Sequence, residues 1–537
     1  MDFENEFTYR RFLETGREHE FDALFDDAVS KVRKELGKRN PMCINGADSF
    51  ASEELKELSP IDGTLIGRFQ KGTKADAARA VEAASTAFVT WSLVGYKERI
   101  EIFRKAAMLL SQRKFETAAA LSIENGKTRY ESVGEVDEAI DFINYYCSEM
   151  ERNKGYLRRN TLAGTTKKVR EGFQGAPGSS ERITIAMRPY GVFAVIAPFN
   201  FPVSISAGMS VGAMITGNTV VFKPSSTDNM SMLTGLLLYR LFKDSGLPDG
   251  VFNYITGPGS EVGAELSSNG KVSGIVFTGS RETGMSMIAG AYERKQQKVF
   301  VVEMGGKNPA IVSSNADLTT AAEGIASAAF GFSGQKCSAC SRVYVHESVK
   351  EEFISKLLER VRAMKIGDPL LKENFIGPLI SAQALARYVA VNEEIRRSCI
   401  PLYGGKVVKS EGNAYYVEPV VAEAEHSNPL MRRELFLPIL LVDTYKKFDE
   451  AIEKANDVEY GLTAGLYSRK SSEIRQFLGG IAAGVVYVNR QESATTGSIV
   501  GHHTFVGWKG SGLTGKGTGS RNYLQQFMRE QSLSVSR

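Results

Sequence analysis

The sequence predicts an α/β protein with a doubly wound parallel sheet, and three observations support this. Short β-rich runs alternate with helical runs from residue 193 onward, with the β-rich runs at 193–197, 219–222, 251–255, 274–277 and 299–302. A second alternating region extends from 309 to about 488. Before both, a stretch at 155–183 is dominated by Gly, Thr, Ser and basic residues, which is typical of an exposed ribbon. Such alternation indicates parallel strands joined by helices.

The part before the ribbon is mainly helical in its pattern. Helical spacing predicts helices over 21–36, 97–124 and 131–153. Thr73 and Asp76 form a capping pattern at the start of a further helix. Its apolar positions then share one face: Ala77, Ala80, Val81, Ala84, Ala87, Phe88 and Trp91. The aromatic residues Phe142, Tyr145 and Tyr146 are expected in the core.

Length and composition exclude several classes of protein. A chain of 537 residues is too long for one core and predicts two or more domains. The 66 basic and 62 acidic residues leave a net charge of +4, which gives no field suited to nucleic acid. No apolar run reaches the length of a membrane span, and the polar start is unlike a secretory or mitochondrial leader. Five scattered cysteines favour a reducing cytoplasm over a disulfide framework.

Chemically distinctive residues follow the five β-rich runs of the first sheet. Ligands of such sheets bind beyond the carboxyl ends of the strands. Turns explain the glycines there, but they do not require Asn200, Lys223 or Glu303. The sequence therefore predicts a ligand site at this edge, formed by the groups 198–202, 223–226, 257–259, 278–280 and 303–307.

The segment 331–340, GFSGQKCSAC, contains a candidate nucleophile. Cys337 follows a glycine-rich turn, which leaves open space beside a sulfur atom. A small buried core cysteine is the alternative interpretation. Cys340 completes a C-x-x-C pattern, which suits a redox pair or half of a zinc site. Because no second pair and no nearby histidine completes a tetrahedral site, we expect no metal and interpret Cys340 as a packing residue.

Seven motifs resemble the aldehyde dehydrogenase family, in its order and spacing, from about residue 40 to the end of the chain. They are PFNFP (198–202), KPSS (223–226), FTGS (277–280), EMGGKNP (303–309), GQKCSA (334–339), ELFLP (434–438) and GWKGSG (507–512). The N-terminal extension and the loop at 496–501 are most similar to the Δ1-pyrroline-5-carboxylate (glutamate semialdehyde) dehydrogenase branch. The resemblance implies a Rossmann-type cofactor domain, an α/β catalytic domain and a small β oligomerisation arm.

The resemblance assigns catalytic roles to three residues. Cys337 would attack the aldehyde carbon and form a thiohemiacetal. Asn200 and the backbone N–H of Cys337 would stabilise the resulting oxyanion. Glu303 would activate the water that hydrolyses the thioester, although a surface ion pair is the alternative role for this carboxylate. Because relatives that use coenzyme A lack this carboxylate, the expected product is a free acid.

For the cofactor, the resemblance implies NAD or NADP. Lys223 resembles the residue that holds the adenosine ribose. At Ser226 many NAD-preferring relatives have a glutamate, so we expect this chain to accept NADP, with NAD also possible. Glu434 would hold the nicotinamide ribose, and Phe436 would flank the ring. The remaining cofactor-side residues are Pro198, Phe199, Gly257, Gly279 and Ser280, although the glycines of 257–259 also suit an ordinary turn.

For the substrate, the branch implies a semialdehyde that carries an amino-acid group. Ser338 with the backbone amides of Gly497 and Ser498 would bind its carboxylate, and Phe201 and Phe505 would flank its aliphatic part. The alternative is that 495–501 is an ordinary flexible loop. The motifs depart from the family at 504–507 (TFVG) and 433–438 (RELFLP), which concerns the substrate more than the reaction. Glu131 and Glu135 are candidates to contact an amino group.

The expected organisation has three parts. Residues 1–154 and 184–304 form the dinucleotide-binding domain, 305–518 the catalytic domain, and 155–183 with 519–537 the oligomerisation arm. We expect a cytoplasmic homo-oligomer that oxidises glutamate semialdehyde. The alternatives are a dehydrogenase of another small aldehyde, such as glyceraldehyde or succinate semialdehyde, and an inactive binding protein on the same scaffold.

Overall fold

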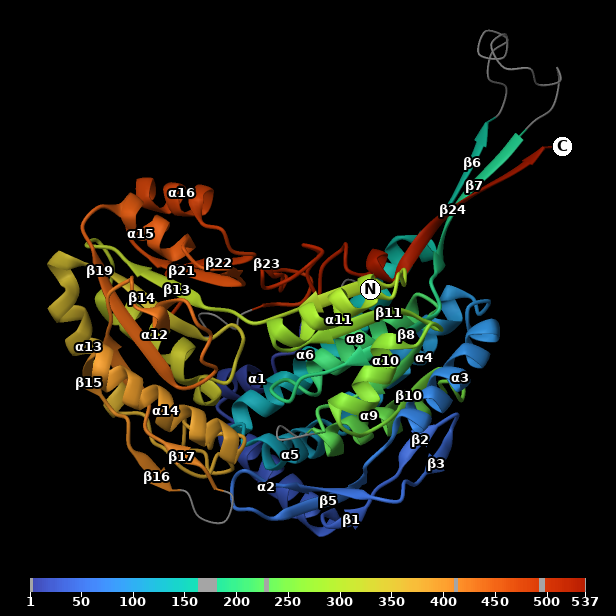
Figure 1. Cartoon of the computed structure of the whole chain (residues 1–537), viewed down its shortest axis with the longest axis horizontal. Helices are drawn as coiled ribbons and strands as arrows, with labels where there is room; N and C mark the ends of the chain where they lie inside the picture. Colours follow the sequence, from blue (N-terminus) through green and yellow to red (C-terminus); the bar gives the residue numbers. More distant parts are fainter. Residues whose placement is uncertain (1–2, 163–180, 227–230, 410–413, 492–497, 537) are drawn as a thin grey trace, which may run out of the picture.

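A computed structural model describes residues 3–162, 181–226, 231–409, 414–491 and 498–536. Two seven-stranded sheets, each covered by helices, form two lobes, and a smaller three-stranded sheet projects away from them (Figure 1). The predicted α/β class is confirmed. In the described ranges, no helix combines the length and apolarity that crossing a bilayer requires.

The first sheet has the strand order β12-β11-β8-β9-β10-β2-β3. Its parallel strands are β8 (Val192–Ile196), β9 (Thr219–Lys223), β10 (Phe252–Tyr254), β11 (Val272–Thr278) and β12 (Val299–Glu303). Ile196 pairs with Lys223, and Thr278 pairs with Glu303. This register places the carboxyl ends of neighbouring strands side by side, as the alternation predicts.

An N-terminal hairpin extends this sheet, and sequence reasoning missed it. The hairpin consists of β2 (Met42–Ile44) and β3 (Ala47–Ser49), and β2 pairs antiparallel with β10. Asn45 and Gly46 both have positive φ, as a two-residue hairpin turn requires. The Asn45-Gly46 pair predicts a turn from the sequence, but strands of three residues are too short to show an alternating pattern.

The helices of this lobe are α1 (Thr8–Glu14), α2 (Glu18–Glu35), α3 (Lys74–Trp91), α4 (Tyr96–Gln112), α5 (Lys114–Asn125), α6 (Arg129–Arg152), α8 (Ser204–Ile215), α9 (Met232–Ser245), α10 (Ala264–Ser268) and α11 (Arg281–Glu293). The single helix predicted over 97–124 is wrong, because the chain breaks at Arg113 between α4 and α5. No glycine or proline marks this break. A small sheet lies beside these helices and contains β1 (Lys38–Arg39), β5 (Leu65–Gln70) and β4 (Glu54–Leu58).

The second sheet has the order β15-β18-β19-β14-β13-β21-β22. Its strands are β13 (Asn308–Val312), β14 (Cys340–His346), β15 (Ile400–Tyr403), β18 (Val420–Glu423), β19 (Ile439–Tyr445), β21 (Thr463–Tyr467) and β22 (Val485–Val488). Its helices are α12 (Leu318–Phe330), α13 (Lys350–Arg362), α14 (Ala382–Ser398), α15 (Phe448–Asn456) and α16 (Ser471–Gly480). Only β15 runs antiparallel to its neighbour among the described strands of this sheet.

The β-rich run at 416–421 predicts a single strand, but the structure has two strands there. Pro419 separates β17 (Tyr416–Val417) from β18, and a proline cannot donate to a strand ladder. β17 instead pairs with β16 (Val407–Lys409). A further two-stranded pair joins β20 (Tyr460–Gly461) to β23 (Trp508–Lys509).

The sequence after Asp317 predicts a helix with Cys337 at its end, but in the structure Cys337 lies beyond that helix. α12 ends at Phe330, and a 3₁₀ turn, η3 (Gly331–Gly334), follows. Phe332 and Ser333 adopt left-handed backbone conformations within it. Such conformations are costly for residues with side chains, so the surrounding structure must hold this turn before Cys337 in place.

The projecting sheet has the order β24-β7-β6. β7 (Glu181–Pro189) lies between β6 (Leu157–Leu162) and β24 (Met528–Ser536), and both pairings are antiparallel. β24 follows a 3₁₀ turn, η6 (Leu524–Phe527), which packs in the core of the first lobe. Segments from opposite ends of the chain therefore form one ribbon, which leaves the body of the molecule (Figure 1).

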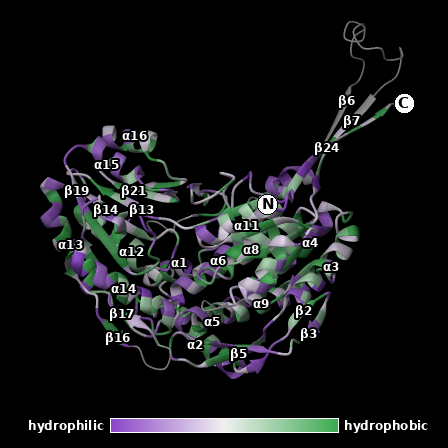
Figure 2. Cartoon of the chain, in the orientation of Figure 1, coloured by the Kyte–Doolittle hydropathy of each residue, from purple (hydrophilic) through white to green (hydrophobic). Residues whose placement is uncertain are grey.

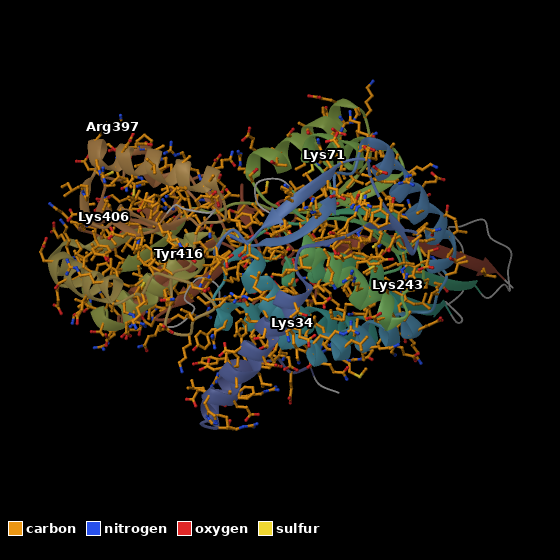
Figure 3. The ribbon with its side chains drawn as sticks, turned by 90° about the horizontal axis from the view of Figure 1, so that it is seen from below. Lys34, Lys71, Lys243, Arg397, Lys406 and Tyr416 are labelled. Carbon is orange, nitrogen blue, oxygen red and sulfur yellow. The ribbon has the colours of Figure 1, made fainter. Side chains whose placement is uncertain are left out.

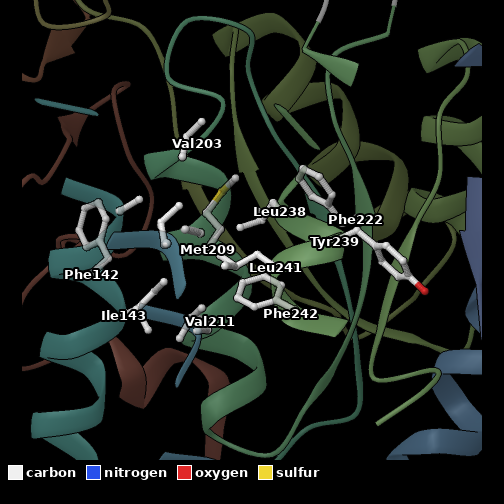
Figure 4. Packing of buried hydrophobic residues seen from close by; sticks show 14 of the residues in the cluster. Phe142, Ile143, Val203, Met209, Val211, Phe222, Leu238, Tyr239, Leu241 and Phe242 are labelled. Atoms are coloured by element: carbon white, nitrogen blue, oxygen red, sulfur yellow. The ribbon is translucent and has the colours of Figure 1, made fainter. Parts of the chain in front are cut away.

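Apolar side chains fill both lobes. The hydrophobic colour is strong along α8 and α12 (Figure 2), and most residues of both helices are buried. In the first lobe, Phe142, Met209, Phe222 and Phe242 belong to one continuous cluster (Figure 4). On the face seen in Figure 3, the labelled basic residues lie apart from one another: Lys34, Lys71, Lys243, Arg397 and Lys406.

The capping box of α3 provides a test of local stability. The Asp76 carboxylate accepts from the Thr73 N–H at 2.8 Å, and the Thr73 hydroxyl accepts from the Asp76 N–H at 3.4 Å. We expect Thr73→Ala to lower the free energy of unfolding by about 1 kcal/mol, because α3 loses its N-cap. Urea unfolding followed by circular dichroism measures this. Thr90→Ala, near the other end of the helix, is the control, and an equal loss there would contradict the assignment.

Candidate active site

A cavity of about 80 Å³ joins residues from both lobes. Its wall includes six residues predicted for the site: Phe201, Glu303, Cys337, Ser338, Ser498 and Phe505. It also includes residues of α6, α8 and β11, among them Glu138, Phe142, Met209 and Thr278. The nucleophile, the carboxylate and the substrate-side residues therefore meet in one space.

The Cys337 thiol lies among groups that act on its charge in opposite directions. Burial and the negative charges of Glu434 and Glu303 raise the pKa of the Cys337 thiol to about 12. Hydrogen bonds from the backbone N–H groups of Cys337 and Ser338 act to lower it. The same N–H groups can stabilise an oxygen that becomes negative beside the sulfur. Because the thiol is mostly protonated at neutral pH, nucleophilic attack requires a base.

Hydrogen bonds from Asn308 fix the turn that contains Cys337. Asn308 Nδ2 donates to the carbonyl oxygens of Cys337 and Ala339, at 2.7 and 2.9 Å. A Cβ at Gly306 would lie 2.3 Å from the Cys337 oxygen, so only glycine fits there. The EMGGKNP motif thus supports the cysteine turn as well as supplying Glu303.

Glu303 is the last residue of β12 and faces the same cavity. Burial raises the pKa of its carboxyl to about 8, and a hydrogen bond from the Gly507 N–H partly opposes this. That bond to Oε2 is 3.0 Å long, and Oε1 has no hydrogen bond among the described residues. A carboxyl with a pKa near neutrality and one unbonded oxygen is suited to accept and return protons.

Asn200 lies against the cysteine turn but does not line the cavity. Its Nδ2 donates to the Gln335 oxygen at 3.1 Å, and the side chain is buried. An amide nitrogen carries two hydrogens, so one remains for a ligand. Gln335 is held in turn, because its Oε1 accepts from the Ile380 N–H at 2.9 Å.

A buried ion pair between Lys127 and Glu135 holds the loop that contains Asn200. Both side chains are fully buried. Lys127 Nζ donates to the backbone carbonyl oxygen of Asn200 at 2.6 Å. The Glu135 carboxylate accepts from the N–H groups of Val203 and Ser204 at 2.8 and 3.2 Å. The ammonium group also lies 3.5 Å from the centre of the Phe201 ring. Sequence reasoning did not find Lys127.

The cofactor-side residues of the first sheet lie at strand ends. Lys223 is buried, and desolvation lowers the pKa of its ammonium group to about 8. Its Nζ and the Ser226 hydroxyl both donate to the Pro224 oxygen, at 3.3 and 3.0 Å. Among the described residues, no carboxylate lies within 4 Å of Lys223. A buried cation without a counter-charge fits a ligand that brings hydroxyl or phosphate oxygens.

Glu434 and Phe436 come from the segment before β19, and Glu434 lies near enough to Cys337 for its charge to act on the thiol. Burial raises the pKa of the Glu434 carboxyl to about 7, and its Oε1 accepts from the Gly306 N–H at 2.9 Å. Phe436, in a left-handed conformation, packs edge-on against Phe199 with ring centres 5.9 Å apart. Both predicted aromatics are therefore neighbours, and the half-buried Pro198 precedes Phe199.

The glycine-rich candidates divide into two kinds. Ser280 is the N-cap of α11, and its hydroxyl accepts from the Thr283 N–H. The Gly279 N–H donates to the backbone carbonyl oxygen of Glu303 at 3.2 Å. A Cβ at Gly257 would lie 2.6 Å from the Gly72 oxygen, so its conformation serves chain packing. Gly279 and Ser280 thus remain candidates for cofactor binding, because they lie at the end of a strand. Gly257 is explained by chain packing alone.

Glu138 is the residue on the substrate side that sequence reasoning missed. Glu131 pairs with Lys336 at 2.7 Å and Glu135 pairs with Lys127, so both are already neutralised. Glu138 lies on the same face of α6, and burial raises its pKa to about 7. Ser498 Oγ is 3.5 Å from its carboxylate, and no described cation lies within 4 Å. Spacing at i, i+4 and i+7 was the available signal.

Gly497 lies outside the described residues, whereas Ser498 lines the cavity. Cys340 is buried in the core of the second lobe, as a packing residue would be. In the part of the chain that the structure describes, no group of three or more His, Cys, Asp and Glu residues is arranged to hold a metal ion.

Comparison with known proteins identifies the family. Residues 48–533 match the profile described as "Aldehyde dehydrogenase family". The chain belongs to this family. A 1-pyrroline-5-carboxylate dehydrogenase 1 of Halalkalibacterium halodurans is 35% identical over 523 residues, which cover 95% of each protein.

Solved aldehyde dehydrogenase structures have the same fold. A 1-pyrroline-5-carboxylate dehydrogenase from Thermus with bound NAD has a TM-score of 0.89 at 34% identity and covers 100% of this chain and 99% of its own. A 3,6-anhydro-L-galactose dehydrogenase in complex with NAP has a TM-score of 0.83 at 29% identity, with 93% and 100% coverage.

The Lys127–Glu135 pair can be tested directly. We expect Lys127→Met to lower the free energy of unfolding by about 3–5 kcal/mol, because it leaves the Glu135 charge buried and unpaired. It should also lower kcat at least about tenfold, because Asn200 loses its support. Urea unfolding and steady-state kinetics measure the two effects.

The matched control is the double variant Lys127→Met/Glu135→Gln. It should regain most of the stability, since a glutamine oxygen still accepts from Val203 and Ser204, while kcat stays low. If the single variant is as stable as the wild type, the pair does not have this role.

Proposed function

We propose that this aldehyde dehydrogenase oxidises L-glutamate 5-semialdehyde, the open form of 1-pyrroline-5-carboxylate, to glutamate. The principal observation is that Glu138 lines the Cys337 cavity with no described cation paired to it. A carboxylate in this place suits a substrate ammonium group. Ser338 and Ser498 lie in the same wall and suit its carboxylate. The names and identities of the relatives give independent support.

The first step uses Cys337 and Glu303. The sulfur bonds to the aldehyde carbon while the thiol proton passes to the Glu303 carboxylate. The carbonyl electrons move to the oxygen, which the N–H groups of Cys337 and Ser338 and the second Asn200 amide hydrogen stabilise. The product of this step is a thiohemiacetal on Cys337.

The second step releases the acid. When bound, NAD or NADP supplies the hydride acceptor for the oxidation. The oxidised carbon remains on Cys337 as a thioester. Glu303 first releases to solvent the proton that it took from the thiol. It then takes a proton from water as the water oxygen attacks this carbon, and the sulfur leaves as a thiolate that is reprotonated through Glu303.

Residues of both lobes fit a dinucleotide. Lys223 and Ser226 are suited to the adenosine ribose, because the buried ammonium group has no described carboxylate beside it. We propose that NADP is accepted as well as NAD, since the neutral Ser226 hydroxyl does not repel a 2′-phosphate. Glu434 is suited to the nicotinamide ribose, and Phe436 and Phe199 to the ring. This assigns 1–154 and 184–304 to the cofactor and 305–518 to catalysis.

The assembly is also part of the proposal. The outer edges of β6 and β24 have no strand partner among the described residues, and open edges pair readily with another copy. We assign 155–183 and 519–537 to a homo-oligomer contact. All five cysteines are free, which supports a reducing cytoplasm.

The pH dependence tests Glu303 as the base. Because its pKa is raised to about 8, the active carboxylate form accumulates as pH rises through this value. We expect kcat to increase with pH, to be half-maximal near pH 8 and to level off about one pH unit above it. In Glu303→Gln, kcat should fall about 10²- to 10⁴-fold, and the acid limb should disappear.

A rapid-mixing experiment separates the two steps in this variant. If the variant forms one equivalent of reduced cofactor per Cys337 in the first turnover and then stops, hydrolysis of the thioester is blocked. An unchanged pH profile in Glu303→Gln would exclude the role. Cys337→Ser is the control, and no burst is expected from it.

A panel of aldehydes tests the substrate. We expect kcat/KM for glutamate semialdehyde to exceed that for propanal, glyceraldehyde and succinate semialdehyde. Glu138→Gln should raise KM for glutamate semialdehyde about tenfold, because a charge-assisted contact is lost, and should leave propanal unchanged. Measurement with both nicotinamides gives the cofactor preference.

A preference for propanal or glyceraldehyde would favour a dehydrogenase of another small aldehyde. Equal effects of Glu138→Gln on both substrates would show that Glu138 does not meet an ammonium group. Absence of any thiol-dependent oxidation would leave only a binding role for the scaffold.

A further inference from the structure

Two buried glutamates lie together in the first lobe, outside the catalytic cavity. Glu57 belongs to β4, and Glu124 is the last residue but one of α5. They are 0% and 1% exposed, and a hydrogen bond joins their carboxyl groups. Among the described residues, no lysine, arginine or histidine nitrogen lies within 4 Å of either carboxyl group. The pair therefore has no cation to balance its charge.

The glutamate pair caps the start of α9, which packs against α5 (Figure 1). The Glu57 carboxylate accepts from the N–H groups of Met232 and Leu233, at 2.9 and 3.2 Å. Glu124 accepts from the Thr234 N–H at 3.1 Å and also from the Thr234 hydroxyl. The first N–H groups of a helix have no partner inside the helix. The two carboxyl groups therefore do what an N-cap side chain does elsewhere.

Two carboxyl groups in this position hold a proton between them. Burial raises the pKa of both groups, and the negative charge of Glu57 raises the pKa of Glu124 further. The partial positive charge at the start of a helix favours one negative charge there. The pair thus has one negative charge and one proton, which Glu124 donates to Glu57.

Tyr254 of β10 is the other titratable group beside the glutamate pair. The negative charges of Glu57 and Glu124 both act on it, and its hydroxyl donates to the Met232 oxygen at 2.8 Å. Apart from Glu124, the groups that shift the pKa of Glu57 against burial are backbone N–H groups of α9. The state of the pair therefore depends mainly on its own proton.

The start of α9 is fastened to the cofactor-side segment after β9. Ser231 directly precedes α9, and its N–H donates to the Ser225 oxygen at 3.1 Å. The Ser231 hydroxyl accepts from the Ser225 N–H at 3.2 Å, so it is not used to cap the helix. Ser225 lies between Lys223 and Ser226 in the chain. A shift at the start of α9 therefore also moves the residues assigned above to the adenosine ribose.

We propose that Glu57 and Glu124, joined by one shared proton, are positioning residues that hold the start of α9 and through it the adenosine-binding residues Lys223 and Ser226. This deepens the function proposed above and rests on its assignment of Lys223 and Ser226 to the cofactor. When the shared proton leaves at alkaline pH, two negative charges repel each other in a dry interior, and cofactor binding weakens.

The dissociation constant for NADH, measured by fluorescence titration, tests the proposal without turnover. We expect it to rise with pH in the wild type, because the pair loses its proton. Lys223 contributes to the same rise, since desolvation lowers the pKa of its ammonium group to about 8. A variant that keeps Lys223 but cannot lose the shared hydrogen separates the two causes.

Glu124→Gln is this variant. Its amide nitrogen donates to Glu57 at every pH, and its oxygen still accepts from the Thr234 N–H. The Thr234 hydroxyl can turn to the Ser231 oxygen, which is 3.4 Å away. Between about pH 7 and about pH 10, we expect the rise in the dissociation constant to be at least about threefold smaller than in the wild type. Equal rises in the two proteins would overturn the proposal.

Glu124→Ala removes both the cap and the bridge. We expect the dissociation constant for NADH at pH 7 to rise at least about fivefold, while kcat at saturating cofactor changes less than about twofold. Glu124→Gln should restore tight binding at this pH. Glu116→Gln, on the exposed side of α5, is the control and should match the wild type. If Glu124→Ala does not fold, the pH comparison with Glu124→Gln decides the question.

Lys223→Met distinguishes failure of this proposal from failure of the cofactor assignment. We expect it to raise the dissociation constant at least about tenfold, because a charge-assisted contact is lost. An unchanged value would mean that Lys223 does not hold the cofactor, and the assignment would fail together with the role of the glutamate pair. A raised value with equal pH dependence in the wild type and Glu124→Gln would overturn only the role of the pair.

Discussion

The buried ion pair between Lys127 and Glu135 is the interaction on which the site depends. It joins the start of α6 to the loop after β8, because Lys127 bonds to the backbone oxygen of Asn200 and Glu135 bonds to the N–H of Val203. Residues far apart in the sequence therefore fix the position of Asn200. Removing one partner would leave a charge without solvent or counter-ion, which is among the most costly changes in a protein interior. The geometry around Asn200 is therefore tied to the stability of the first lobe.

Desolvation gives the cavity its chemical character. It raises the pKa of the carboxyl groups of Glu303, Glu138 and Glu434 to between about 7 and 8, and that of the Cys337 thiol to about 12. Each group is thus biased toward its neutral form near pH 7. A carboxyl group with a pKa near neutrality can act as a base and then return the proton, which suits a reaction in which a thiol must first lose its proton and a water molecule must lose one later.

The sequence predicted the elements whose signal is local. Alternation predicted the parallel strands, and the groups at their ends predicted Lys223, Asn200 and Glu303 as candidates. It did not predict the β2–β3 hairpin, the break at Arg113 or the division at Pro419, because short strands and helix ends depend on tertiary contacts. Lys127 and Glu138 were missed for a different reason. Their roles come from what packs against α6, and a helix face reveals its partners only in three dimensions.

The contact between Glu303 and the Gly507 N–H has a consequence for synthesis of the protein. The segment around Gly507 also bonds to Met304 and Gly305 through Ser511. A nascent chain on the ribosome can form the first sheet long before this segment emerges. The carboxylate therefore acquires its final environment only near the end of translation, and incomplete chains that already contain Cys337 lack a finished centre.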